Sequence, residues 1–130
     1  MLHWSERYIG LPYVLGESDC GHMAAGILRE VFGKTIPERA AVEREVSRLG
    51  RVHQMSDVVE SFCLPVDAPE EGDLVLMLCR GRPSHIGVYC RVNGRGCVLH
   101  AMENAGMTVL HPIARLSSLL LSVEGYYRWK

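Results

Sequence analysis

The chain has 130 residues, 48% of them hydrophobic and 22% charged, and a formal net charge of −1 at pH 7. This length fits one domain, residues 1–130, that can bury a core without disulfide bonds. The near-neutral charge and the scattered arginines argue against a nucleic-acid partner, and no apolar run is long enough to span a membrane.

The N-terminus has neither the charged start nor the apolar run of a signal peptide over residues 1–7. We therefore expect synthesis in the cytoplasm without a signal peptide. If the target lies outside the cytoplasm, something other than the general export pathway must deliver the protein.

The helical part of the chain follows a start that is punctuated as loop or turn by the glycines and proline of residues 8–16. Apolar residues then recur at helical spacing from Asp19 to Phe32, with Ser18 or Asp19 as the cap and Gly33 as the stop. A second helix is predicted from Glu38 to Leu49 and a short third one from Ser56 to Phe62.

Strand patterns follow beyond Pro65, with a tight-turn signal at Asn93-Gly94 and a helical turn from Pro112 to Leu120. The predicted strands are Leu74–Cys79, His85–Arg91, Cys97–Met102, Met107–His111 and Val123–Trp129. Helices followed by an antiparallel meander indicate an α+β fold, with N-terminal helices packed on a roughly five-stranded antiparallel sheet.

The cysteines form an odd set without paired spacing, which fits neither a disulfide framework nor a zinc ribbon. Four of them are predicted to be small core residues: Cys63, Cys79, Cys90 and Cys97. We expect no metal and no cofactor.

Cys20 differs because it falls in the first turn of the predicted helix. A thiol attacks carbonyl groups well only as the thiolate, and the helix dipole with its unpaired N–H groups favours an anion there. The same N–H groups can receive the oxyanion of a tetrahedral intermediate.

A base for this thiol is predicted at His85, which begins a strand. Alternation places His85, Gly87 and Tyr89 on one face of that strand, and the glycine leaves room for a helix end. His100 lies across the Asn93-Gly94 hairpin and can orient the imidazole of His85.

Alternatives to this set are few. Glu103 or Asn104 can replace His100 as the orienting group. The remaining histidines have no partner pattern, and we expect them at the surface: His3, His53 and His111. A helix-start cysteine, a strand histidine and a polar group on the next strand together are typical of papain-like hydrolases.

Four ordered blocks resemble the NlpC-type cell-wall cysteine peptidases, with the form found in bacteriophage tail proteins as the nearest match. They are residues 8–13 with Gly16 and Asp19-Cys20-Gly21, residues 72–75, residues 84–89, and residues 98–101. The resemblance implies a papain-like NlpC-type fold and a catalytic triad of Cys20, His85 and His100. It also implies that Tyr13 helps to fix the oxyanion site, and it matches Asp19 to the acidic residue before the cysteine.

One departure concerns the residues after the cysteine, where this chain has Gly21-His22 in place of the family's Ser-Gly. The usual stem-peptide specificity is therefore open. Gly21, His22 and Ser84 adjoin the predicted catalytic residues and are the candidates for binding substrate. An exposed position on the helix surface is the simpler interpretation of His22.

The resemblance implies a cysteine peptidase or amidase that hydrolyses peptidoglycan stem peptides through a thioester acyl-enzyme. It suggests cleavage near the bond between γ-D-glutamate and the diamino acid. Phage tail proteins or a secretion machine are the implied partners, and no nucleic acid is expected. Two other hypotheses remain, a non-catalytic tail-assembly module of the same fold and a cysteine acyltransferase or thioesterase.

Overall fold

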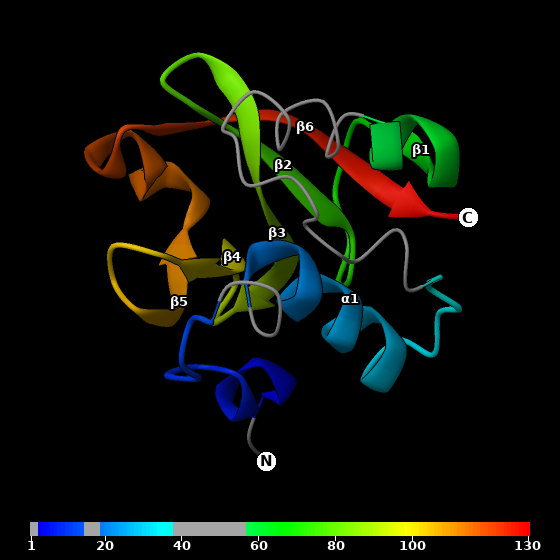
Figure 1. The fold of residues 1–130 in the computed structure, drawn as a ribbon, viewed down its shortest axis with the longest axis horizontal. Coiled ribbons are helices and arrows are strands. Elements are labelled where there is room, and N and C mark those ends of the chain that lie inside the picture. Colours follow the sequence, from blue (N-terminus) through cyan, green and yellow to red (C-terminus); the bar gives the residue numbers. More distant parts are fainter. Residues whose placement is uncertain (1–2, 15–18, 38–56) are drawn as a thin grey trace.

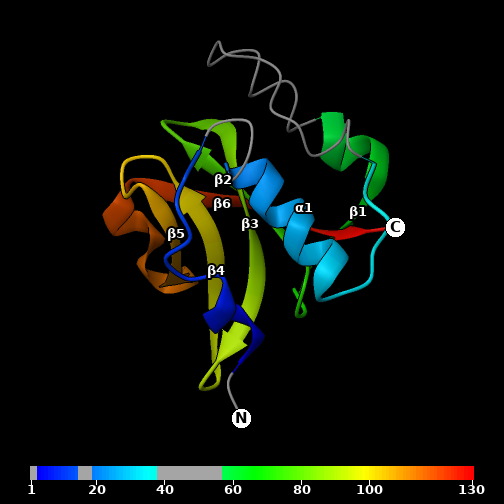
Figure 2. The same cartoon turned by 60° about the horizontal axis from the view of Figure 1, so that its bottom comes forward.

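The computed structural model describes residues 3–14, 19–37 and 57–130. Figures 1 and 2 show helix α1 lying against a strongly curved antiparallel sheet. The elements in chain order are η1 (Trp4–Arg7), α1 (Cys20–Glu30), β1 (Cys63–Val66), β2 (Leu74–Cys79), β3 (Arg82–Val92), β4 (Arg95–Met102), β5 (Met107–Pro112), η2 (Ile113–Leu119) and β6 (Leu121–Trp129).

The sheet has six strands in the order β1-β6-β2-β3-β4-β5, and all neighbouring strands are antiparallel. The predicted α+β arrangement and the meander of four strands from β2 to β5 are confirmed. The sheet has one strand more than the roughly five predicted, because β1 pairs with β6 at the sheet edge. The sequence predicted strands only beyond Pro65, whereas Pro65 itself lies in β1, and an edge strand tolerates a proline.

The core consists of two apolar clusters on the two faces of the sheet. On one face, Ile27 and Leu28 of α1 pack with Leu76, Val88 and Leu99. The other face packs Val75, Met77 and Val98 of the strands with Leu116 of η2. Successive strand residues therefore serve opposite clusters, as the alternation of strand side chains requires.

Helix α1 begins one residue after Asp19, whose carboxylate caps it by accepting the backbone N–H of His22 at 3.0 Å. It ends at Glu30, slightly before the predicted Phe32, and Gly33 then adopts a left-handed conformation with φ 64°. Residues 57–62 are helical, in agreement with the short predicted helix. The predicted helix from Glu38 to Leu49 lies outside the described residues.

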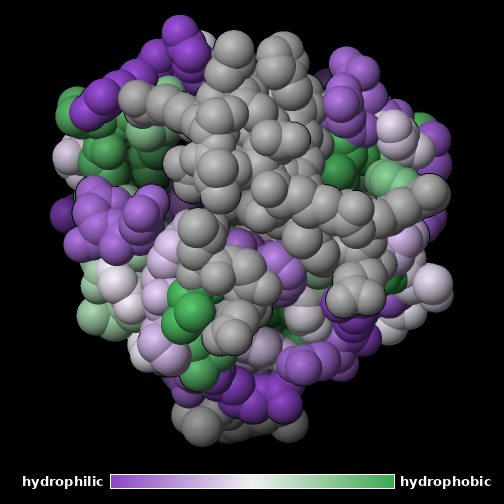
Figure 3. Space-filling view, viewed as in Figure 1, coloured by the Kyte–Doolittle hydropathy of each residue, from purple (hydrophilic) through white to green (hydrophobic). Residues whose placement is uncertain are grey.

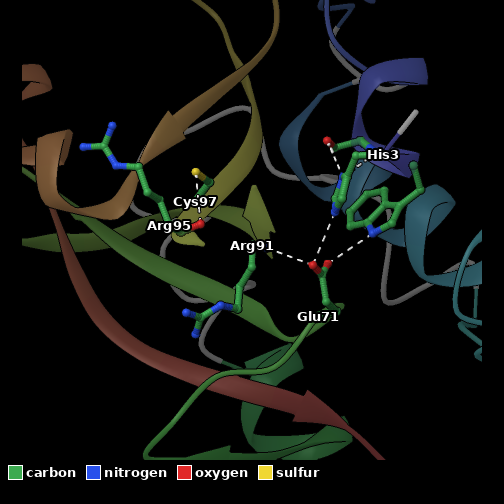
Figure 4. Close-up of polar contacts among 7 residues, drawn as sticks. His3, Glu71, Arg91, Arg95 and Cys97 are labelled. Atoms are coloured by element: carbon green, nitrogen blue, oxygen red, sulfur yellow. Dashed lines mark hydrogen bonds and ion pairs between the residues drawn. The ribbon is translucent and has the colours of Figure 1, made fainter. Parts of the chain in front are cut away.

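The N-terminal turn η1 is held to the sheet by Glu71, in the turn before β2 (Figure 4). The Glu71 carboxylate accepts hydrogen bonds from Trp4 Nε1 at 3.1 Å and from the backbone N–H of Arg91 at 2.9 Å. His3 Nε2 lies 3.3 Å from the same carboxylate. These contacts hold the start of the chain, ahead of residues 8–16 that the sequence predicted as loop or turn, against the sheet.

None of the helices in the described ranges is long and apolar enough to cross a membrane. On the face in Figure 3, the coloured residues form small apolar areas separated by hydrophilic side chains.

Candidate active site

A cavity of about 400 Å³ opens where β2 ends, β3 begins and β4 turns toward β5. Its wall combines the predicted nucleophile and base with residues from several other segments: Tyr13, Cys20, Cys79, Arg80, Ser84, His85, Ala101, Met102, Glu103, Asn104, Leu119 and Leu121. The fold thus brings Cys20 and His85, which are far apart in the sequence, to one cavity.

Cys20 is the first residue of α1 and is 5% exposed. It occupies the helix position where the first N–H groups lack intrahelical partners. The preceding Asp19 is fully buried and accepts a second hydrogen bond from His22, whose Nδ1 lies 2.7 Å from Asp19 Oδ1. His22 is therefore partly buried and bonded to the helix cap, and its predicted place on an exposed helix surface is wrong.

His85 and His100 form a hydrogen bond between His85 Nε2 and His100 Nδ1 with a length of 2.7 Å. Their ring planes are inclined by 69°, so the edge of one imidazole meets the other ring. His100 is 1% exposed, whereas His85 is only partly buried and reaches the cavity. The Nε2 atom of His85 is engaged by His100, and the atom left for a substrate or a thiol is Nδ1.

Burial controls the charge of both imidazoles. It lowers the pKa of His85 from 6.5 to about 4. Burial also lowers the pKa of His100 to about 2, with further contributions from the neighbouring His85 and His111. Both rings are neutral at pH 7, and a neutral imidazole is the form that can accept a proton.

Gly87 makes this pairing possible by leaving space between β3 and β4. A Cβ atom at this position would lie 2.5 Å from Val98 Cγ2 and 2.9 Å from His100 Cβ. The sequence interpretation, that the glycine makes room for a helix end, is wrong, because β4 takes the space. Ile86 and Val88 point to the α1 side and Tyr89 to the opposite cluster, as the predicted alternation requires.

His111 is the residue that the sequence analysis missed. Predicted at the surface, it is only partly exposed, and its Nδ1 lies 2.9 Å from His100 Nε2. The sequence carried a signal for this contact, because it predicted both of the strands that became β4 and β5. In the structure these two strands pair with His100 opposite Val109. Residues 109 and 111 lie on the same face of a strand, so this pairing sets His111 on the face that carries His100.

The remaining candidates divide between the cavity wall and its surroundings. Tyr13 and Ser84 line the cavity, whereas Gly21 and His22 lie in the first turn of α1 outside its described lining. Glu103 and Asn104 are exposed on the wall. Because His100 engages His85 Nε2, neither of these two residues is needed to orient that ring.

The other cysteines are free thiols, and the structure buries Cys63, Cys90 and Cys97 as predicted. Burial raises the pKa of Cys63 and that of Cys90 to about 12, so both are protonated at neutral pH. Cys79 departs from the prediction because it is only partly buried and lines the cavity.

A buried sulfur at a helix start, a neutral imidazole on the same cavity and a second imidazole behind it can together support nucleophilic attack on a carbonyl group. The sequence model of the NlpC/P60 family matches residues 10–117, which include all these groups. No curated protein and no solved structure matched the chain.

Proposed function

Because the chain belongs to the NlpC/P60 family, whose members are cysteine peptidoglycan hydrolases, we propose that it cleaves an amide bond of a peptidoglycan stem peptide with Cys20 as the nucleophile. His85 is the base in this proposal, and His100 orients it. The observation that carries the proposal is the 2.7 Å hydrogen bond between His85 and His100 at a cavity that Cys20 also lines.

The reaction begins when Nδ1 of His85 takes the proton from the Cys20 thiol. The sulfur attacks the amide carbonyl, and the N–H groups at the start of α1 stabilise the oxyanion, with support from Tyr13. His85 then gives its proton to the leaving amine as the C–N bond breaks, which leaves a thioester on Cys20. Water, deprotonated by His85, cleaves the thioester and releases the acid.

His100 contributes by accepting the N–H of His85 throughout the reaction. When His85 becomes an imidazolium ion, this bond becomes charge-assisted, and such bonds are about twice as strong as neutral ones. The gain is realised only as charge develops, so it lowers the barrier more than it tightens substrate binding.

Several polar and charged side chains on the cavity wall suit a peptide substrate. The wall offers a cation at Arg80, an anion at Glu103 and neutral hydrogen-bonding groups at Ser84 and Asn104. Stem peptides carry both free carboxylates and an amine, which these groups can pair with. We place cleavage near the bond between γ-D-glutamate and the diamino acid, as the resemblance implies.

Delivery by a virion tail or a secretion machine belongs to the same proposal and starts from the resemblance of the four blocks to the phage-tail form of the family. Detection of the chain in purified virions or in secreted material would support it, and confinement to the cytoplasm of intact cells would contradict it.

The experiment is digestion of purified peptidoglycan and of soluble stem peptides, read by mass spectrometry. Fragments are expected from the wild type and none from Cys20→Ala. Cys79→Ala is the matched control, because it removes the other thiol on the cavity wall, and it should yield the same fragments. Equal digestion by wild type and Cys20→Ala would overturn the proposal. Transfer of the acyl group to an added amine in preference to water would indicate an acyltransferase.

A further inference from the structure

We propose that His111 is a positioning residue of this site, which sets the tautomer of His85 through His100. The catalytic meaning of this inference rests on the proposed function, although the tautomer itself can be measured without it. His111 lies on β5, outside the described lining of the cavity, and therefore acts through another side chain.

The three imidazoles form one chain of hydrogen bonds across β3, β4 and β5. His85 Nε2 lies 2.7 Å from His100 Nδ1, and His100 Nε2 lies 2.9 Å from His111 Nδ1. The rings of His100 and His111 are inclined by 64° with centroids 5.2 Å apart, an edge-on arrangement like that of the first pair. Both nitrogens of the buried His100 ring are thus engaged by other histidines.

Proton counting leaves only two arrangements of this chain. A neutral imidazole carries one N–H, and each hydrogen bond needs one donor and one acceptor. If His100 carries its proton on Nε2, it donates to His111 and accepts from His85 Nε2, which leaves Nδ1 of His85 unprotonated. If His100 carries its proton on Nδ1, both bonds reverse and Nδ1 of His85 holds a proton.

All three rings must be neutral for this count to hold. Burial lowers the pKa of each of them, including that of His111, so the neutral forms prevail at pH 7. Only the first arrangement allows His85 to act as a base toward Cys20. The tautomer of His111 is therefore linked to that of His85: His85, two hydrogen bonds away, can accept the thiol proton only when Nδ1 of His111 is the acceptor.

Substitutions at His111 separate this role from a purely structural one. His111→Asp supplies an acceptor that cannot donate, which holds His100 in the productive form. His111→Leu has neither donor nor acceptor and leaves Nε2 of His100 without its hydrogen-bond partner on β5. Loss of one neutral hydrogen bond should lower kcat of His111→Leu by about two- to 13-fold. KM should stay unchanged, since His111 does not line the cavity, and His111→Asp should retain most of kcat.

The decisive readout is the tautomer of His85, from the ¹⁵N chemical shifts of the ring nitrogens in the full-length protein at pH 7. Wild type and His111→Asp should show His85 protonated on Nε2 and unprotonated on Nδ1. His111→Leu should show a larger share of the Nδ1-protonated form, and a thermal unfolding transition establishes that each variant is folded.

The inference is overturned if wild-type His85 is protonated on Nδ1, or if His111→Leu changes neither the tautomer nor kcat. It is also overturned if His111→Asp loses as much activity as His111→Leu. Should the wild type yield no peptidoglycan fragments, the proposed function fails, while the tautomer measurement still decides the role of His111.

Discussion

Replacement of His100 by leucine removes the acceptor that holds His85 and keeps a side chain of similar volume in the core. The lost bond is 2.7 Å long and becomes charge-assisted when His85 is protonated during catalysis. Hydrogen bonds to charged groups contribute about 1.5–3 kcal/mol. Because about 1.36 kcal/mol corresponds to a tenfold change in rate, His100→Leu should lower kcat by about 10- to 150-fold.

His100→Asn is the matched control. Its side-chain oxygen can take the place of Nδ1 and accept the N–H of His85, so this variant should lose much less activity than His100→Leu. The assay is steady-state hydrolysis of the stem peptide that the wild type cleaves, with thermal unfolding as the test of folding. A folded His100→Leu variant with the wild-type kcat would refute the reasoning, as would equal losses in both variants.

Three further predictions concern stability. Gly87→Ala should destabilise the fold by about 1–3 kcal/mol in urea unfolding, since its Cβ would meet atoms of β4, including His100 Cβ, at 2.9 Å or less; unchanged stability would contradict the close approach of the strands. Asp73→Asn should lower the free energy of unfolding by about 2 kcal/mol, because the buried carboxylate accepts hydrogen bonds from both Nε and Nη2 of Arg128 at 2.9 and 2.8 Å. Unchanged stability in urea unfolding would contradict that account. Burial lowers the pKa of His85 and of His100, so the unfolded chain binds more protons than the folded one between pH 6.5 and about 4. The free energy of unfolding should therefore fall as the pH falls through this window, by at most about 1.4 kcal/mol per pH unit for each histidine. The fall should be less steep in His100→Asn.

Much of the fold follows from local patterns in the sequence. The run Leu74–Cys79 became β2 with the predicted bounds. Asn93 and Gly94 have φ angles of 53° and 76°, the left-handed conformations that a tight hairpin needs at both positions, and they fix the register of β3 and β4. That register was sufficient to predict that His100 lies beside His85.

The errors arose where long-range packing decides the outcome. Pro65 lies in an edge strand that exists only because β6 returns beside β2, and no local pattern shows that return. The partner of His22 is the buried carboxylate of Asp19, which the helix spacing alone did not reveal. The prediction for His111 was wrong because its partner depends on the register between β4 and β5, which sets it on the face that carries His100.

The central claim is that the Cys20 sulfur forms a covalent acyl-enzyme with its substrate. It is tested most directly by mixing the wild type with a cleavable stem peptide, stopping the reaction with acid within milliseconds to seconds, and measuring the intact mass of the protein. The account predicts a mass increase equal to the substrate minus its leaving amine, located on Cys20 by peptide mapping and absent from Cys20→Ala. Cleavage by a Cys20→Ala variant, or an adduct located on another residue such as Cys79, would contradict it.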